Sequence, residues 1–185
     1  MGSETQASVQ PRSLYMKVLT ILGCANRLGA RAASQADVVN AVIEARSPAF
    51  MYFKHHRRHG SQLVPCSEKL ISDRVRLCCD LRLLDPATGR LSRHGAQALQ
   101  PGRYAKVVTA QTLTFLAEQG FDFSLIQQRV RTAAQSLWLP TSRALYEAAT
   151  GELRLVEFRR LLNLLAECGH FRVLQSRIYL PANSD

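Results

Sequence analysis

Long apolar runs are missing from this 185-residue chain. Hydrophobic residues make up 46% of it, yet unbroken apolar stretches last only a few residues. A membrane-spanning helix needs roughly 20 apolar residues, so none is expected. The first residues, MGSETQASVQP, have no apolar core of the kind that a secretory signal carries. We therefore expect a cytoplasmic protein, and the polar residues 1–12 are predicted to be a disordered lead-in.

Signatures of catalysis are also missing. The sequence has no GxxxxGK[ST] phosphate-binding loop, no GxGxxG after a strand, no HExxH and no GxSxG nucleophile elbow. The 14 acidic residues mostly stand near arginines, as in Asp73 with Arg76 and Glu157 with Arg160. Such pairs are typical of solvent-exposed helix faces. The pattern therefore predicts a protein that is not an enzyme and holds no cofactor.

Cysteine pairs with the CxxC spacing of redox or zinc sites do not occur. The count is odd, and the two adjacent cysteines cannot share one face of a helix. We expect all five to be reduced packing residues, as is usual in the cytosol. They are Cys24, Cys66, Cys78, Cys79 and Cys168.

What the chain does have is positive charge. Its net charge is +10, from 24 Lys and Arg against 14 Asp and Glu, and 20 of the 24 are arginine. The arginine fork matches phosphate and guanine, which favours a polyanionic partner. Residues 1–100 carry 14 basic and 7 acidic residues, whereas residues 101–185 carry 10 and 7. The first half is therefore the better candidate for a nucleic-acid contact.

The pattern between Ser67 and Leu99 organises this first half. Ser67 is predicted to cap a helix that runs to Leu84 with one apolar stripe. Pro86 cannot extend the helix, and Gly89 tolerates the positive φ of a tight turn. A hairpin with the short strand Arg90 to Ser92 should follow, and a new helix begins near His94.

A helix with a polar outer face followed by a hairpin resembles the recognition helix and wing of winged helix-turn-helix domains. The resemblance implies that the helix and the wing bind duplex DNA, with Arg76 as the residue best able to pair with guanine. The residues that carry it are Ser67, Ile71, Val75, Leu81, Leu84, Asp85, Gly89, Leu91 and Gly95. The DNA-contacting residues expected on the helix and wing are Ser67, Lys69, Ser72, Asp73, Arg76, Arg90 and Arg93.

Two further helices precede this stretch and complete a predicted domain over residues 13–100. The first begins at Ser13 and ends near Gly29, and Ser34 caps the second. A compact winged helix joins its second and third helices by a few residues, whereas here Ser47 to Cys66 intervene. An insertion of this length usually has structure or function of its own.

The insertion combines an aromatic start with a basic run. Ala49 to Phe53 are predicted to form a helical turn on the core, and Lys54, Arg57 and Arg58 to contact phosphate. A zinc site is an alternative, because His55 and His59 stand at i and i+4 with Cys66 downstream. A solvated charge run is the other alternative.

The break Gln100-Pro101-Gly102-Arg103 is the predicted domain boundary, and residues 101–185 form a second, helical domain. Its first helix, Tyr104 to Gln119, offers Val108, Leu113 and Leu116 either to a second copy of the chain or to the domain's own core. Three further helices are expected from Asp122, from a cap at Thr141 or Ser142, and from Glu152 to Cys168. A hairpin over His170 to Pro181 follows, as in a second winged helix or an ordinary α+β fold.

We therefore expect a mainly α fold with short β-hairpins (α+β), in which a winged helix-turn-helix domain precedes a helical second domain. The predicted function is DNA binding, as a transcription regulator or a DNA-engaging accessory factor that forms a homodimer through residues 104–119. The alternative is a tandem winged-helix adaptor with a protein partner at the second domain. Arginines that share one surface would favour DNA, and scattered ones the adaptor.

Overall fold

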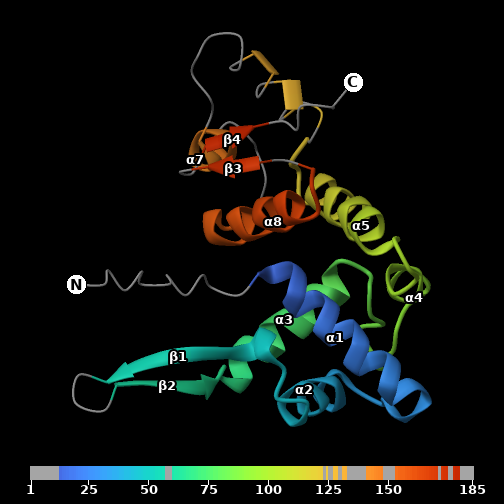
Figure 1. Ribbon diagram of the computed structural model, residues 1–185. Coiled ribbons are helices and arrows are strands. Elements are labelled where there is room, and N and C mark those ends of the chain that lie inside the picture. Colours follow the sequence, from blue (N-terminus) through green and yellow to red (C-terminus); the bar gives the residue numbers. More distant parts are fainter. Residues whose placement is uncertain are drawn as a thin grey trace.

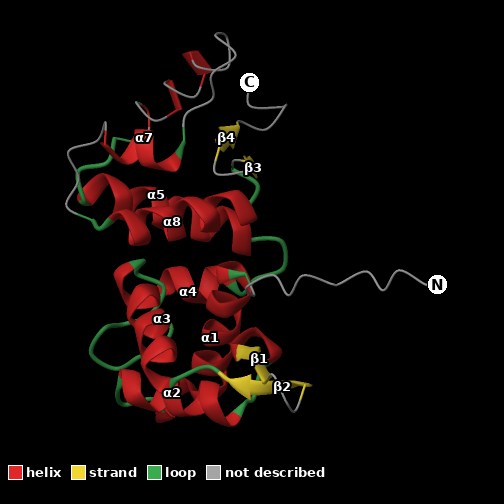
Figure 2. Cartoon of the chain, turned by 90° about the vertical axis from the view of Figure 1, so that its left-hand side faces the viewer, coloured by secondary structure: helices red, strands yellow, loops and turns green. Residues whose placement is uncertain are grey.

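The computed structural model describes residues 13–56, 60–122, 124, 127–128, 131–132, 141–147, 153–170, 172–174 and 177–179. Over these residues the chain is mainly helical with two small antiparallel sheets, as expected for the α+β class, and a winged helix is not confirmed (Figures 1 and 2). The helices are α1 (Leu14–Leu28), η1 (Gly29–Arg31), α2 (Gln35–Glu44), η2 (Pro48–Phe50), α3 (Glu68–Asp80), α4 (Arg93–Ala98), α5 (Tyr104–Glu118), α7 (Ser142–Glu147) and α8 (Leu155–Glu167). The strands are β1 (Met51–His56), β2 (Gly60–Pro65), β3 (Arg172–Leu174) and β4 (Arg177–Tyr179).

The first two helices begin where the sequence predicts, just after Ser13 and Ser34. The Ser13 hydroxyl accepts a hydrogen bond of 3.0 Å from the backbone N–H of Met16 at the start of α1. At the start of α2, Ser34 and Asp37 form a capping box, and the Asp37 carboxylate accepts from the N–H of Ala33 and Ser34. The hydrogen bonds from Ala33 and Ser34 lower the pKa of Asp37. Together with the Ser13 bond, they fix the direction in which the two helices begin.

The insertion forms a β-hairpin, which the sequence did not predict. The helical turn is limited to η2, where Ala49 and Phe50 are buried, and β1 then pairs with β2 from Met51↔Pro65 to His56↔Gly60. The ladder satisfies backbone groups that an isolated turn would leave to water. Figure 1 shows this hairpin projecting from the helices as an arm. We call η2, β1 and β2 the arm.

Helix α3 begins at its predicted cap but ends four residues early, at Asp80. The N–H of Leu83 donates to the carbonyl of Cys78, and that of Arg82 to Cys79, which is a Schellman ending. Arg82 adopts the positive φ of 55° that glycine usually supplies there. The expected end at Leu84 was wrong, because the residue whose positive φ ends the helix is an arginine and no glycine marks the position in the sequence.

The hairpin expected after Pro86 is reduced to one antiparallel bridge, between Leu84 and Leu91. The turn between them packs on the start of α2 instead of projecting. A Cβ on Gly89 would lie 2.7 Å from the carbonyl oxygen of Ser34, and the Gln35 amide donates to the carbonyl of Pro86. The two contacts with α2 leave no free wing at this position.

The second half confirms most of the expected elements. Thr141, one of the two proposed caps, accepts from the N–H of Ala144 at the start of α7. Helix α8 buries the predicted stripe through Phe158 and Leu165 and ends before Gly169, whose φ is +83°. Strands β3 and β4 pair in the predicted hairpin. The helix expected from Asp122 lies mostly outside the described residues.

The face of α5 that was offered to a second copy belongs to the core. Val108 and Leu116 are fully buried, and Leu113 is half-buried. Thr112 is buried between them and donates its hydroxyl to the carbonyl of Val108 at 2.7 Å. Two of the three proposed dimer residues are therefore inaccessible, because α5 packs against α4 and α8 within the chain.

The buried side chains of both halves form one cluster. Helix α1 contacts α8, the hydroxyl of Tyr104 donates to the carbonyl of Tyr15, and the Glu167 carboxylate accepts from the N–H of Tyr15. A second layer stacks Phe121 on Phe158 with ring centroids 4.8 Å apart. The expected boundary at Gln100–Arg103 stays a prediction, and the core continues across it.

None of the helices in the described ranges combines the length and apolarity that a membrane crossing requires.

All five cysteines are free thiols, and three of them are buried. Burial raises the pKa of Cys79 to about 11, and it likewise raises that of Cys168 to about 11. These thiols stay protonated at neutral pH, as packing residues do.

Candidate nucleic-acid interface

The exposed side of α3 holds the residues that the sequence assigned to a recognition helix. Lys69, Ser72 and Arg76 are exposed, and so is Asp73. Ser67 is also exposed, and its hydroxyl accepts from the N–H of Leu70 at 3.3 Å as the helix cap. The helical period brings Lys69 and Arg76 to one face, because they stand seven residues apart.

The arm leads directly into this helix. Its base is closed by a hydrogen bond of 2.8 Å from the N–H of Cys66 to the carbonyl of Phe50, one residue before the Ser67 cap. Lys54 lies on β1 opposite Gln62. Arg57 and Arg58, with His59 of the alternative zinc site, lie outside the described residues. The arm thus connects the basic run of the sequence to the start of α3.

Arg90, which was predicted to lie on the wing, makes hydrogen bonds within the fold. Its guanidinium donates to the carbonyl oxygens of Ala32 and Ala30, both at 2.8 Å, in the connection between α1 and α2. The DNA contact expected of Arg90 stays a prediction, although its Nε and Nη2 atoms already donate to a loop about 60 residues away in sequence. The guanidinium holds together the loops on either side of α2.

The turn before Arg90 is built to direct it there. One oxygen of Asp85 accepts from the N–H groups of Ala87 and Thr88 and from the Thr88 hydroxyl. These hydrogen bonds, led by that of the Thr88 hydroxyl, lower the pKa of Asp85. The N–H of Gly89 closes the turn on the Asp85 carbonyl at 2.8 Å. Asp85 and Thr88 therefore use their side chains within the turn itself.

We expect Arg90→Ala to lower the free energy of unfolding by about 1–3 kcal/mol, because two backbone carbonyls lose a charged donor. Urea unfolding followed by circular dichroism measures this loss. Arg93→Ala is the matched control, since Arg93 is exposed at the first position of α4 and makes no side-chain hydrogen bond in the described structure. An Arg90→Ala protein as stable as the control would show that the two hydrogen bonds of Arg90 do not stabilise the fold.

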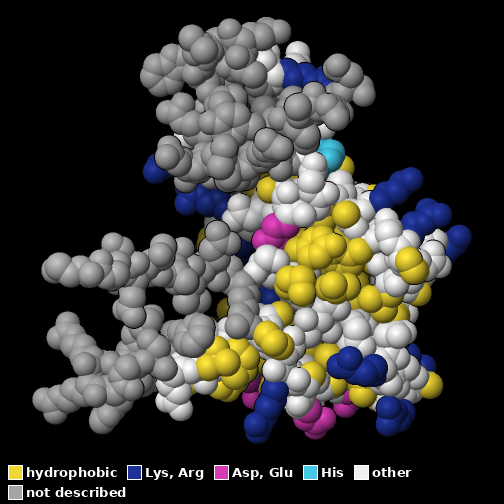
Figure 3. Space-filling model, viewed as in Figure 1, with side chains coloured by type: hydrophobic (Ala, Val, Ile, Leu, Met, Phe, Trp, Pro, Cys, Tyr) yellow, Lys and Arg dark blue, Asp and Glu magenta, His cyan; other side chains and the backbone are white. Residues whose placement is uncertain are grey.

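Among the described residues, the predicted cations Lys69, Arg90 and Arg93 lie on different elements of the chain. Arg90 faces the α1–α2 connection and Arg93 lies on α4, whereas Lys69 belongs to α3. On the face shown in Figure 3, Lys and Arg side chains lie at several separate places along the edge, and apolar side chains fill the middle.

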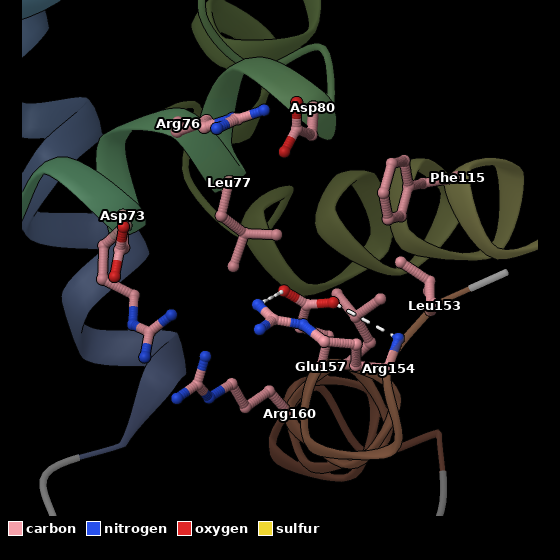
Figure 4. A pocket seen from close by; sticks show the side chains of 11 residues that line it. Asp73, Arg76, Leu77, Asp80, Phe115, Leu153, Arg154, Glu157 and Arg160 are labelled. Atoms are coloured by element: carbon pink, nitrogen blue, oxygen red, sulfur yellow. Dashed lines mark hydrogen bonds and ion pairs between the residues drawn. The ribbon is translucent and has the colours of Figure 1, made fainter. Parts of the chain in front are cut away.

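A cavity of about 360 Å³ lies where α3 faces α8, and Figure 4 shows its side chains. Asp73 and Arg76 line it, so part of the presumed recognition face turns toward the second half of the chain. The expected pair of Glu157 with Arg160 is replaced, because Glu157 pairs with Arg154 at 2.6 Å. Asp73 and Arg76 form no ion pair in the described structure.

Sequence reasoning missed Arg74, Arg154 and Arg160, which line this cavity. A signal existed for Arg74, because it stands three residues after Ile71 and four before Cys78, inside the apolar stripe of α3. Arg154 and Arg160 gave no such signal, since only tertiary packing brings them to α3.

No metal-binding cluster of His, Cys, Asp or Glu occurs among the described residues. Neither a protein-family model nor a curated protein nor a solved structure matches the chain.

Proposed function

We propose that the protein binds duplex DNA through the arm and the exposed face of α3, without enzymatic activity. The observation that carries this proposal is the direct junction of the arm with α3. The sequence of the arm supplies Lys54, Arg57 and Arg58, and α3 adds Lys69 one turn after the junction. A two-stranded ribbon and a helix are both elements that fit the major groove.

Charge supports the same proposal. The chain carries +10 overall, and most of the excess lies in the half that contains the arm. Contacts by Lys and Arg to phosphate release counterions, so such binding is strongly salt-dependent. Lys69 supplies a phosphate contact, and Arg76 the donors for a base edge.

A titration of a random-sequence duplex, followed by fluorescence anisotropy, tests the proposal. We expect the affinity to fall by orders of magnitude between about 50 and 200 mM salt. Replacing Arg57 and Arg58 together by Ala should weaken binding to all sequences and reduce the salt slope by about 2. Lys69→Ala should reduce it by about 1.

Arg103→Ala is the control, because Arg103 is exposed just before α5 and away from the arm. It should leave the affinity within about twofold of wild type, well below the 1–3 kcal/mol of a specific contact. Equal losses in the control and the arm variant would show charge effects alone. Failure to bind at low salt would refute DNA binding.

The adaptor function is the second candidate, and the separation of the predicted cations favours it. Arg90 is used inside the fold, and Asp73 and Arg76 turn toward α8. In that case the arm would dock on a protein. Retention of a partner by the arm variant, with no DNA binding by the wild type, would support the adaptor.

A further inference from the structure

The cavity between α3 and α8 holds more positive charge than its carboxylates neutralise. Four arginines and three acidic residues line it. The only ion pair among them is the one between Arg154 and Glu157. Arg74, Arg76 and Arg160 make no hydrogen bond or ion pair with their side chains in the described structure. The acidic residues are Asp73, Asp80 and Glu157.

Arg74 is the unusual member of this set. Its exposed fraction is 8%, so it is more than nine-tenths buried, and it still lines the cavity. Arginine is almost never buried to this extent without a partner, because desolvating its charge is costly. No side-chain nitrogen of Arg74 is both buried and unpaired, so its guanidinium is open to the cavity that the residue lines. It has no protein acceptor there in the described structure, so an acceptor from outside the chain can reach it.

Two more cations approach Arg74 from different helices. Burial lowers the pKa of Arg74, and the nearby charge of Arg160 on α8 lowers it further, whereas Asp73 raises it. Burial also lowers the pKa of Lys17 on α1, with Arg74 and Arg160 adding to the effect. Cys66 and Glu167 raise it. Lys17 on α1, Arg74 on α3 and Arg160 on α8 are therefore close enough to repel one another.

We propose that this cavity binds the phosphate group of a small organic phosphate between Arg74 and Arg160, which both line it. A phosphate dianion offsets more of the repulsion than a carboxylate does, and its oxygens match the arginine fork. The concave position between two helices suits a small molecule better than the backbone of a rigid duplex. This site does not depend on the proposed DNA binding.

The rest of the cavity fits the organic part. In Figure 4, Phe115 and Leu153 lie on one side and Arg160 points to the other. Leu77 and the ion pair of Arg154 with Glu157 lie between these two ends, so the cavity has an apolar side and a cationic side. The volume of about 360 Å³ lies at the lower end of the range for small-molecule sites. Asp80, which also lines the cavity, repels phosphate and can accept from a hydroxyl or amine of the ligand.

Calorimetric titrations at constant ionic strength test the proposal with three probes and no DNA. Phenyl phosphate has both a phosphate and an apolar body, inorganic phosphate has only the first, and benzoate has the ring with a carboxylate. We expect phenyl phosphate to bind most tightly of the three. Equal binding of benzoate and phenyl phosphate, or of inorganic and phenyl phosphate, would overturn the proposed ligand class.

The variants Arg74→Met and Arg160→Gln assign the site. Each should weaken phenyl phosphate about ten- to a hundredfold, the range for a charge-assisted hydrogen bond. Arg103→Gln is the matched control and should bind as wild type does. The exposed Arg160 keeps the test available if the Arg74 variant fails to fold. Binding that is unchanged in both variants, or reduced equally in the control, would contradict the site.

The melting temperature in chloride separates a ligand site from a packing role. Removing an unpaired buried charge should raise the Tm of Arg74→Met, since apolar replacement of buried charges is often stabilising. The same variant should lose the increase in Tm that phenyl phosphate gives the wild type. A lower Tm in chloride with an unchanged response to phenyl phosphate would make Arg74 a packing residue. Loss of duplex binding with phenyl phosphate binding intact would place both arginines on the DNA surface and overturn the cavity site.

Discussion

Gly95→Ala is expected to abolish most of the stability of the fold, with a loss of at least about 3 kcal/mol. Gly95 lies in α4, where a Cβ would overlap the carbonyl oxygen of Leu83 and reach within 3.0 Å of the Leu91 side chain. The obstacle is backbone, and the Leu83 carbonyl is held in place by the N–H of Ser92 at 3.1 Å. Equilibrium unfolding in urea measures the loss.

Gly23→Ala is the matched control, because Gly23 lies inside α1 and a Cβ there would meet nothing within 4 Å. This substitution should stabilise the protein by about 0.5–1 kcal/mol, since alanine restricts the unfolded chain and favours helix. Opposite signs for the two substitutions would confirm the close approach of α4 to Leu83. Similar small effects would show that α4 is not packed against that carbonyl.

Phe158→Ala should lower the free energy of unfolding by about 3–5 kcal/mol, which is the second large effect that we expect. Phe158 is fully buried on α8, stacked on Phe121 and 5.6 Å from the Tyr146 ring, measured between centroids. Val156→Ala on the same helix is the control, because Val156 is exposed, and its effect should stay within about 0.5 kcal/mol.

The Phe158 variant also tests the boundary expected at Gln100–Arg103. Because α1 and α8 share one core, we expect amide exchange to accelerate in both halves of the chain. Hydrogen exchange measured by mass spectrometry reports this by segment. Faster exchange confined to residues 101–185 would instead indicate two independently stable domains.

Local signals predicted the helices well. Ser13 and Ser67 cap helices because a serine oxygen accepts a free N–H group of the first turn, wherever the helix packs. Ser34 begins α2 through its capping box with Asp37. Helix α8 followed from its apolar period alone. Such features depend on neighbours within four residues, so one sequence contains them.

Features set by distant contacts were missed. Helix α3 ends at Asp80 because Arg82 accepts a left-handed conformation, and its guanidinium pairs with Glu118 on α5 at 2.5 Å. A glycine at position 82 would have predicted this helix end, whereas an arginine there does not. Arg90 was assigned to DNA because its acceptors, the carbonyls of Ala30 and Ala32, come from a remote loop.

The residues of the candidate site also fall into two groups, those predicted from local signals and those placed by distant contacts. The exposed positions of Lys69 and Ser72 followed from the helical period, and the structure places them so. The arm was hidden because its charged residues interrupt the alternation that marks a strand, while its aromatic start also suits a helix. The cavity required α8 to lie against α3, which no local pattern encodes.

The arm has a definite reach. Six residues at about 3.4 Å each extend it roughly 20 Å from its buried anchor at Phe50. That span is more than half of the ~34 Å that duplex DNA needs for one turn. In the DNA binding that we propose, a single chain with α3 in one groove would reach the adjacent groove with the arm. The protein itself would then set the spacing of the two contacts, and the DNA site would need no two-fold symmetry.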